Sequence, residues 1–215
     1  MYREKTTGLW CRENTLDEYV VKEQSCYSEF LNLVRDSIVM DIGGNIGAFT
    51  YKAIESGAKK VIAFEPEPGN AELFKRQDFY ESPRVKLIER AISDKSGIAD
   101  FYVNSSGKNK GLHSLQEIQG RHKIQVRTAG FKQAVTKFSP EYIKIDIEGG
   151  EYGIDLSNLP LNVKGIAIEV HLTHGNNREQ GENLIKILKK QFPVVLKEPK
   201  ITDKNWTTLF IGRRK

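Results

Sequence analysis

Short, apolar, β-branched segments alternate with segments of helical spacing along most of this chain, and that alternation limits the folds open to it. The strand candidates are Ser37–Ile42, Lys60–Glu65, Arg84–Glu89, Tyr142–Ile147 and Gly165–Val170. Helical spacing is found at Ala48–Ser56, Ala71–Tyr80, Phe131–Lys137 and Gly181–Gln191. Such alternation is typical of right-handed βαβ units, so it predicts a parallel sheet whose strands end at a common edge, where ligands bind.

The C-terminal part of the chain completes this prediction. Two further strands are expected at Pro193–Lys197 and Thr207–Gly212, and the short connection predicts that they pair antiparallel. We therefore expect an α/β, Rossmann-like sheet of seven mostly parallel strands, with helices on both faces and an antiparallel C-terminal pair. The 215 residues contain no repeat or linker, which favours a single domain over 1–215, covered by the N-terminal segment 1–36.

One region breaks the alternation and carries most of an uneven charge. A short strand at Ala99–Val103, a polar loop and a strand at Lys123–Thr128 indicate an insertion on the sheet edge, at about residues 98–128. Residues 104–137 hold seven Lys or Arg and one acid, Glu117, whereas the whole chain has a net charge of +5. A basic segment on a near-neutral body is typical of a surface for an anionic partner, and equally of an ordinary solvated surface.

Composition bears on whether the chain is a membrane protein, a secreted protein or a cytoplasmic protein. No apolar run approaches the roughly 18–20 residues that span a bilayer, and the polar N-terminus lacks the apolar core of a secretory signal. Cys11 and Cys26 are too few for a disulfide framework or a zinc site. These features favour a cytoplasmic protein without a membrane span.

A glycine-rich turn after the first strand indicates a nucleoside-containing cofactor. Gly43 and Gly47 permit a tight turn and a close approach of the backbone to a ligand, and the helix that follows offers free N–H groups. The next strand ends in Glu65, where a carboxylate accepts hydrogen bonds from both hydroxyls of a ribose. The structural alternative is that the glycines only shape a turn and that Glu65 lies on the surface.

The acid before the glycines distinguishes between cofactors. Asp41 closes the first strand, where its charge would repel the pyrophosphate of a dinucleotide. A carboxylate at that point suits the ammonium and sulfonium groups of S-adenosyl-L-methionine. The turn therefore favours this cofactor over NAD.

Several blocks in this order resemble the FkbM family of methyltransferases, within the class I S-adenosylmethionine-dependent fold. Asp41-Ile-Gly-Gly-Asn-Ile-Gly47 resembles D-[IV]-G-A-N-I-G, with Gly44 in place of alanine. Ala63-Phe-Glu-Pro-Glu-Pro-Gly-Asn70 resembles A-F-E-P-x-P-x-N, and Lys144-Ile-Asp-Ile-Glu-Gly-Gly-Glu151 resembles K-[IL]-D-[VI]-E-G-x-E. Looser similarity is found at Ala91-Ile-Ser-Asp-Lys-Ser-Gly97 and in an upstream D…E…Y pattern formed by Asp17, Glu23 and Tyr27.

The resemblance implies a seven-stranded α/β sheet, S-adenosyl-L-methionine as cofactor and S-adenosyl-L-homocysteine as product. It also implies, in most members, O-methylation of a hydroxyl on small molecules such as polyketides or on sugars. The residues that we expect to bind the cofactor are Asp41, Gly43, Asn45, Gly47, Glu65, Pro66, Asn70, Ala91, Asp146 and Tyr27. The loop 109–115 matches the family only in part, so the acceptor is not carried over from it.

Methylation of a hydroxyl requires alignment of the reacting atoms and either a base or a metal-bound alkoxide. Asp146 ends its strand at the cofactor's methionine end, where it either holds the ammonium or deprotonates the acceptor. Glu169 and His171 share one strand face, and an imidazole titrates near neutral pH. We predict that Asp146, Glu169 and His171 are catalytic, with an ordinary edge histidine as the alternative for His171.

Acids and a histidine at these strand ends also raise the question of a metal. Asp146, Glu148, Glu169 and His171 form a set compatible with a divalent ion, but their spacing matches no specific metal motif. No resident metal is therefore expected.

The leading hypothesis is an O-methyltransferase whose acceptor is a small molecule or carbohydrate, anionic if the basic segment lies beside it. An RNA or nucleotide-sugar methyltransferase, with residues 104–137 following phosphates, is the second reading. Aromatic residues do not interleave with those basic residues, which disfavours nucleic acid as a partner. A non-catalytic cofactor-binding domain and, against the charge of Asp41, an NAD-dependent oxidoreductase complete the alternatives.

Overall fold

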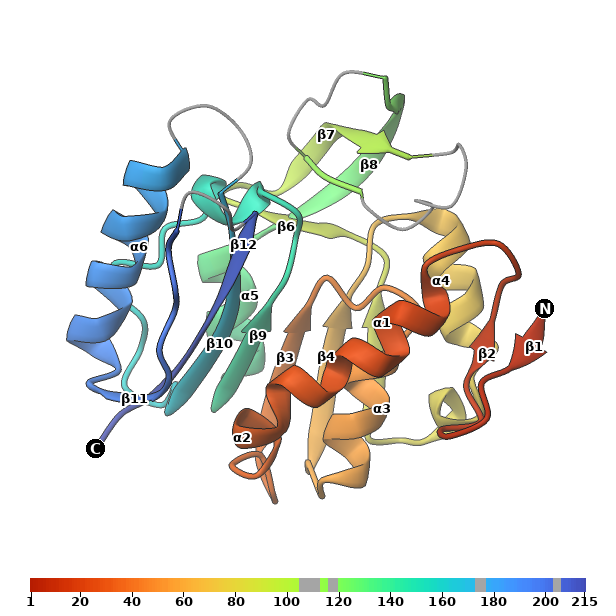
Figure 1. The fold of residues 1–215 in the computed structure, drawn as a ribbon, viewed down its shortest axis with the longest axis horizontal. Coiled ribbons are helices and arrows are strands. Elements are labelled where there is room, and N and C mark those ends of the chain that lie inside the picture. The colour runs from red at the N-terminus through yellow and green to blue at the C-terminus, as the bar shows by residue number, and fades with distance from the viewer. Residues whose placement is uncertain (105–112, 116–119, 173–176, 203–205) are drawn as a thin grey trace.

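The central element of the computed structural model is a seven-stranded sheet with the order β11-β12-β10-β9-β3-β4-β5 (Figure 1). The structure describes residues 1–104, 113–115, 120–172, 177–202 and 206–215. The strands are β3 Ile38–Ile42, β4 Lys60–Phe64, β5 Val85–Ile88, β9 Tyr142–Ile145, β10 Gly165–His171, β11 Val194–Lys197 and β12 Thr207–Arg213. β3, β4, β5, β9 and β10 are parallel, and β12 pairs antiparallel with both β10 and β11. The predicted Rossmann-like sheet is confirmed, including its antiparallel C-terminal pair.

Alternate residues of the central strands enter two different cores. Met40 and Ile42 of β3 belong to the larger core, which also contains buried residues of α5 (Phe131–Phe138) and α6 (Asn177–Gln191). Val39 packs on the opposite side with Phe30 and with residues of α3 (Ala48–Glu55). Successive side chains of a strand point to opposite faces, so helices cover both sides of the sheet, as predicted.

The helix predicted over Ala71–Tyr80 instead spans α4, Pro68–Lys75, followed by a short 3₁₀ turn, η2, at Asp78–Glu81. It begins early because the Glu67 carboxylate accepts hydrogen bonds from the backbone N–H groups of the first turn, at 2.6 and 2.9 Å. It ends early because Gln77 is extended, and its side chain bonds the backbone of Trp10 and Ile46. A long-range contact thus overrides local helical spacing.

The N-terminal residues lie over the face of the sheet that α3 also covers (Figure 1). β1 (Tyr2–Arg3) and β2 (Trp10–Cys11) form a small hairpin, followed by α1 (Asp17–Glu23), a 3₁₀ turn η1 (Gln24–Tyr27) and α2 (Ser28–Leu31). Arg12 fixes the start of α1 to the body of the protein. Its guanidinium donates to Asp17 at 2.8 and 2.9 Å and to Asn70 at 2.7 Å.

The expected insertion is a separate sheet rather than an addition to the edge of the main one. β6 (Ala91–Ser93), β8 (His122–Gly130) and β7 (Gly97–Val103) pair in that order, and β8 is parallel to β6 and antiparallel to β7. This sheet has its own apolar cluster, centred on Phe101 and Val126. In Figure 1 it lies beyond the ends of β3, β4 and β9. Within the described part of the chain, the helices are all too short or too polar to cross a membrane.

Candidate functional site

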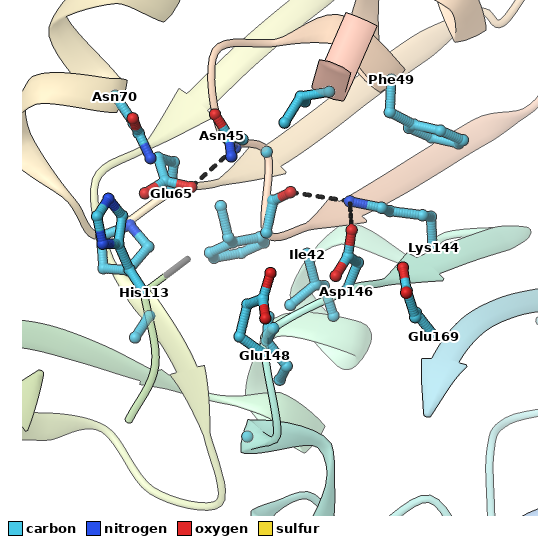
Figure 2. Close-up of a pocket in the computed structure, with 18 of the residues that line it drawn as sticks. Ile42, Asn45, Phe49, Glu65, Asn70, His113, Lys144, Asp146, Glu148 and Glu169 are labelled. Atoms are coloured by element: carbon cyan, nitrogen blue, oxygen red, sulfur yellow. Dashed lines mark hydrogen bonds and ion pairs between the residues drawn. The ribbon is translucent and has the colours of Figure 1, made fainter. Parts of the chain in front are cut away.

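A cavity of about 480 Å³ opens at the carboxyl ends of the parallel strands (Figure 2). Its floor is formed by residues that follow β3, β4, β9 and β10, and its walls come from α1, the three-stranded sheet and the start of β12. The volume lies within the range of small-molecule sites, and the position is the one at which open α/β sheets bind ligands.

The glycine turn after β3 brings two strand ends into contact. Gly43 has a φ of +83°, and a Cβ atom there would lie 1.8 Å from the backbone oxygen of Asp146. Only glycine fits such a close approach. At Gly44 an added Cβ would lie 3.4 Å from the Ala63 Cβ, so the alanine of the resembling motif would be accommodated. Gly43 therefore holds Asp146 at the floor of the cavity.

Glu65 lies at one end of the cavity and is almost completely buried. Its Oε2 atom accepts a hydrogen bond from the backbone N–H of Asn45 at 2.8 Å, and its Oε1 atom accepts one from Glu67 at 2.9 Å (Figure 2). Burial raises the pKa of Glu65 to about 7, although both backbone donors favour the ionised form. The Asn70 side chain also donates to this carboxylate, which still has acceptor capacity for hydroxyls of a ligand.

Pro66, Asn70 and Ala91, which are predicted from the sequence to bind the cofactor, also line the cavity. Asn70 is buried and is held by the Arg12 guanidinium. Asn45 lies in the left-handed region, with a φ of +48°, and its side-chain oxygen accepts from the N–H of Ile46 at 2.8 Å. Asparagine tolerates this conformation better than most residues.

Asp41 is not where the sequence argument required it. Its carboxylate does not line the cavity but is fully buried behind it, where Oδ2 accepts from the Thr50 hydroxyl at 2.7 Å. Oδ1 lies 3.3 Å from Nζ of Lys144, which also donates to the Gly43 oxygen at 2.8 Å. Asp41 shares the face of β3 that packs on α3, so it supports Lys144 instead of facing a ligand.

Lys144 connects this buried pair to the cavity. Burial alone would lower the pKa of its ammonium, but the carboxylates of Asp41 and Asp146 outweigh burial and raise it. Nζ lies 3.7 Å from Oδ2 of Asp146 (Figure 2). Lys144 therefore stays charged and holds Asp146 at the edge of the site.

Carboxylates gather around the end of the cavity opposite Glu65. Asp146, Glu148, Glu169 and Glu23 all line it. Burial, then the charge of Asp146, raises the pKa of Glu169 to about 8, and burial with the charges of Asp146 and Glu148 raises that of Glu23. This crowding of acids lowers the free energy of a positively charged ligand at that end.

His171 ends β10 and lines the cavity, but its ring is already engaged. Nδ1 lies 3.2 Å from Oε1 of Glu151 and Nε2 lies 3.4 Å from Oε2 of Glu148. Burial opposes the charged ring, whereas both glutamates favour it, and the pKa of His171 is raised well above its ordinary value. Both ring nitrogens therefore face carboxylates of the protein, and the role of general base for His171 stays a prediction.

Two other predicted cofactor residues do not reach the cavity. Gly47 has a φ of +91°, and a Cβ there would lie 2.5 Å from the Phe79 ring, so this glycine serves the turn and the packing of aromatic rings. Tyr27 is buried, with its ring edge-on to Phe49 at 5.4 Å. Neither belongs to the cavity lining. The geometry therefore does not support direct cofactor contact for these two residues.

Glu151 lies in the short 3₁₀ turn η4, Gly150–Gly153. Its buried carboxylate accepts from the backbone N–H of Gly149 at 2.9 Å and from that of His171 at 2.6 Å. It therefore joins the segment after β9 to the end of β10.

The basic segment 104–137 contributes one described cation to the cavity, Arg121. Lys123 pairs with Asp100, Lys132 with Asp155, and Arg127 is exposed on β8. Lys108, Lys110 and Glu117 lie outside the described residues. The Nη1 atom of Arg121 is buried and has no hydrogen-bond partner within the described ranges.

The predicted catalytic and cofactor-binding residues did not include the polar cavity residues Glu23, Gln24, Glu148 and Arg121. Glu23 stood in the loose upstream pattern, and Glu148 stood two residues after Asp146. Nothing local to Gln24 or Arg121 marks them, because each is brought to the cavity by a segment whose placement depends on distant contacts. In the described part of the chain, Oε1 of Gln24 is buried without a partner, while its Nε2 donates to the Val20 oxygen at 2.7 Å.

The structure is a Rossmann-like domain with a cavity of small-molecule size at the carboxyl ends of its parallel strands. The sequence profile described as "Methyltransferase FkbM domain" matches residues 41–192, which is most of the chain. The chain belongs to the FkbM methyltransferase family.

Individual relatives are more distant. "Methyltransferase 1" of Beauveria bassiana (strain ARSEF 2860) is 26% identical over 163 residues, which cover 64% of this chain and 65% of that protein. The match thus spans slightly less than two thirds of that relative's length.

Solved structures share the fold. The C-terminal domain of precorrin-6Y C5,15-methyltransferase from Rhodobacter capsulatus superposes with a TM-score of 0.52 at 16% identity, covering 90% of this chain and 89% of that one. A SAM-dependent methyltransferase from Agrobacterium tumefaciens gives 0.53 at 10% identity, covering 92% and 63%. At these identities the likeness concerns the fold alone.

Proposed function

We propose that this chain is an S-adenosyl-L-methionine-dependent methyltransferase that methylates a hydroxyl on a small molecule or carbohydrate. The observation that carries the proposal is the position of Glu65. It is a buried carboxylate with acceptor capacity left beside its protein donors, and it lines the same cavity as a group of acids at the other end. Such a cavity suits a ligand with a ribose diol at one end and positive charge at the other.

The donor set fits this cofactor on chemical grounds. Glu65 would accept hydrogen bonds from the ribose hydroxyls. Asp146, Glu169 and Glu23 would offer carboxylate oxygens to the ammonium, whose charge would in turn favour their ionised forms, and the unpartnered Gln24 oxygen would accept one of its protons. The sequence argument for a positively charged ligand therefore survives, although it rests on these residues and not on Asp41.

When bound, S-adenosyl-L-methionine supplies an electrophilic methyl group. The protein's own part is to align the acceptor oxygen and to remove the hydroxyl proton. Asp146 is the candidate for this proton because its carboxylate is about a quarter exposed to the cavity and is held by Lys144. Since His171 is engaged by two glutamates, we assign it a structural part in the site and not that of base.

Arg121 supports an acceptor that carries a negative charge. A buried guanidinium nitrogen without a described partner is costly to leave unpaired, and a carboxylate or phosphate would satisfy it. The remaining described cations of the segment pair elsewhere or face solvent, which does not support a continuous phosphate track for RNA. A small anionic acceptor is therefore favoured over nucleic acid.

Thermal shift tests the cofactor. S-adenosyl-L-homocysteine should raise the melting temperature in a dose-dependent way, and NAD should not. A shift with NAD alone would overturn the proposal.

Transfer of labelled methyl groups to pairs of hydroxy compounds, with and without a carboxylate or phosphate, tests the acceptor. For the anionic partner of a pair, Arg121→Gln should raise KM by about 10- to 100-fold. Arg127→Gln, which replaces an exposed arginine on β8, is the matched control. Equal effects of the two substitutions, or no preference for anionic compounds, would contradict the assignment of Arg121.

A further inference from the structure

We propose that Asp146, Glu148 and His171 form a binding site for a divalent cation, in which Glu151 holds His171 in position. A ring nitrogen of His171 and one oxygen from each of the two acids all lie within 4.8 Å of one another. Asp146 and Glu148 follow β9, and His171 ends the neighbouring parallel strand β10. The cluster therefore arises from the sheet and not from a local sequence motif.

The surroundings of His171 are those of a metal-ligating histidine. Its backbone N–H donates to Oε1 of Glu151 at 2.6 Å, and its ring Nδ1 lies 3.2 Å from the same oxygen. A cation bound at Nε2 would displace the proton on that nitrogen, whereas the Glu151 carboxylate behind Nδ1 would keep the other proton in place. Glu151 is itself fully buried and is held by the N–H of Gly149 at 2.9 Å. The imidazole is therefore oriented before any ligand arrives.

The two acids complete the cluster from the open side. Side chains of Asp146 and Glu148 are each 27% exposed, and Figure 2 shows both carboxylates directed into the cavity. Ligand atoms around a six-coordinate cation with bonds of about 2.1 Å lie roughly 3–4 Å apart, so small rotations of these two side chains suffice. The positions that protein atoms do not fill face the cavity.

The charge balance of the site also favours a cation. Five carboxylates surround it, those of Glu23, Asp146, Glu148, Glu151 and Glu169. The described cations near them are Lys144, which is shared with the buried Asp41, and Arg121. The uncompensated negative charge lowers the free energy of a bound divalent ion.

Two carboxylate oxygens and one imidazole nitrogen form a mixed ligand set that suits Mn²⁺ and similar ions. An ion bound there would favour loss of the proton from a coordinated acceptor hydroxyl. This catalytic use rests on the proposed methyl transfer, whereas the binding of the ion does not.

The test measures Mn²⁺ binding directly, on the full chain without cofactor, by the loss of the free-ion EPR signal and by calorimetry. Wild-type protein should bind about one Mn²⁺ per chain. Glu148→Gln and His171→Gln should weaken binding by at least about 10- to 100-fold, and Glu151→Gln, which removes only the support, should weaken it by a similar factor. Glu23→Gln, which also removes one cavity carboxylate, is the charge-matched control and should retain binding.

Circular dichroism of each variant separates loss of the fold from loss of a ligand. Glu148→Gln lies at a partly exposed position and is the decisive variant if the buried substitutions fail to fold. Absence of Mn²⁺ binding to the wild type, or equal weakening by Glu148→Gln and Glu23→Gln, would overturn the proposal and leave His171 as an imidazolium paired with two glutamates. Binding of S-adenosyl-L-homocysteine, measured separately, shows whether the proposed function fails independently of the metal site.

Discussion

Glu65 provides the sharpest test of the cofactor site because both of its carboxylate oxygens already have a defined partner. Replacement by glutamine keeps the shape of the side chain but turns one acceptor oxygen into a donor. One ribose hydrogen bond is then lost, and the other no longer ends on a charged group. Hydrogen bonds to charged groups contribute about 1.5–3 kcal/mol each. We expect Glu65→Gln to weaken S-adenosyl-L-homocysteine binding by about 2–3 kcal/mol, or about 30- to 150-fold in Kd.

The same substitution also acts on the fold. Glutamine turns an NH₂ group toward the backbone N–H of Asn45 or Glu67, and an unsatisfied buried donor costs about 1–3 kcal/mol of the free energy of unfolding. Calorimetric titration at pH 8 should therefore be combined with urea unfolding, so that affinity is measured under conditions in which the variant is folded.

Glu67→Gln is the matched control for this experiment. Glu67 does not line the cavity, and its carboxylate caps α4. Its replacement should cost about 1 kcal/mol of stability and leave the affinity for S-adenosyl-L-homocysteine within about twofold. Unchanged affinity in Glu65→Gln, or an equal loss in Glu67→Gln, would refute the assignment of Glu65 to the ribose.

Three further predictions concern the same site. Burial raises the pKa of Glu65 to about 7, so its carboxylate becomes protonated between pH 8 and pH 6. Over that range, the difference in affinity for S-adenosyl-L-homocysteine between wild type and Glu65→Gln should shrink by up to about tenfold. Calorimetric titrations at both pH values check this. Lys144→Met leaves Asp41 buried without its cation and should lower the free energy of unfolding by about 3–5 kcal/mol in urea titrations, part of which Asp41→Asn in the same chain restores. Gly43→Ala should abolish S-adenosyl-L-homocysteine binding, because its Cβ would displace the backbone of Asp146, whereas Gly44→Ala should bind like the wild type in the same calorimetric assay.

Local sequence patterns, such as apolar runs and helical spacing, predicted most of the fold. The apolar strands that became β3, β4, β5, β9 and β10 were found from the sequence within a residue or two, because their burial on both faces gives continuous apolar runs. The end of α4 and the separate sheet formed by β6, β7 and β8 depend on contacts between distant residues, which local spacing does not report. Tertiary contacts therefore determine where α4 ends and how β6, β7 and β8 pair.

The candidate site shows a similar division. Glu65, Asp146, Glu169 and His171 follow strands, and the carboxyl ends of parallel strands meet at one edge, so the sequence was sufficient to bring them to the cavity. The direction of a side chain was harder to foresee. Asp41 points to the face of β3 that packs on α3, as Val39 does. Its charge is neutralised there by Lys144, a partner 103 residues further along the chain. The metal-compatible cluster likewise depends on the left-handed backbone of Glu148, for which the sequence offers no signal.

The parallel pairing of β6 with β8 has a consequence for how this protein changes over time. Ser93 and Gly130 are partners in that ladder, so the chain leaves the body of the protein and returns to it at one place. Insertions whose two ends lie close together are the ones that folded domains tolerate best. The segment between those two residues is therefore an insertion, and it includes the cavity residues Phe101 and Arg121. Such an insertion can change in length and sequence while β3, β4 and the glycine turn after β3 keep the same geometry.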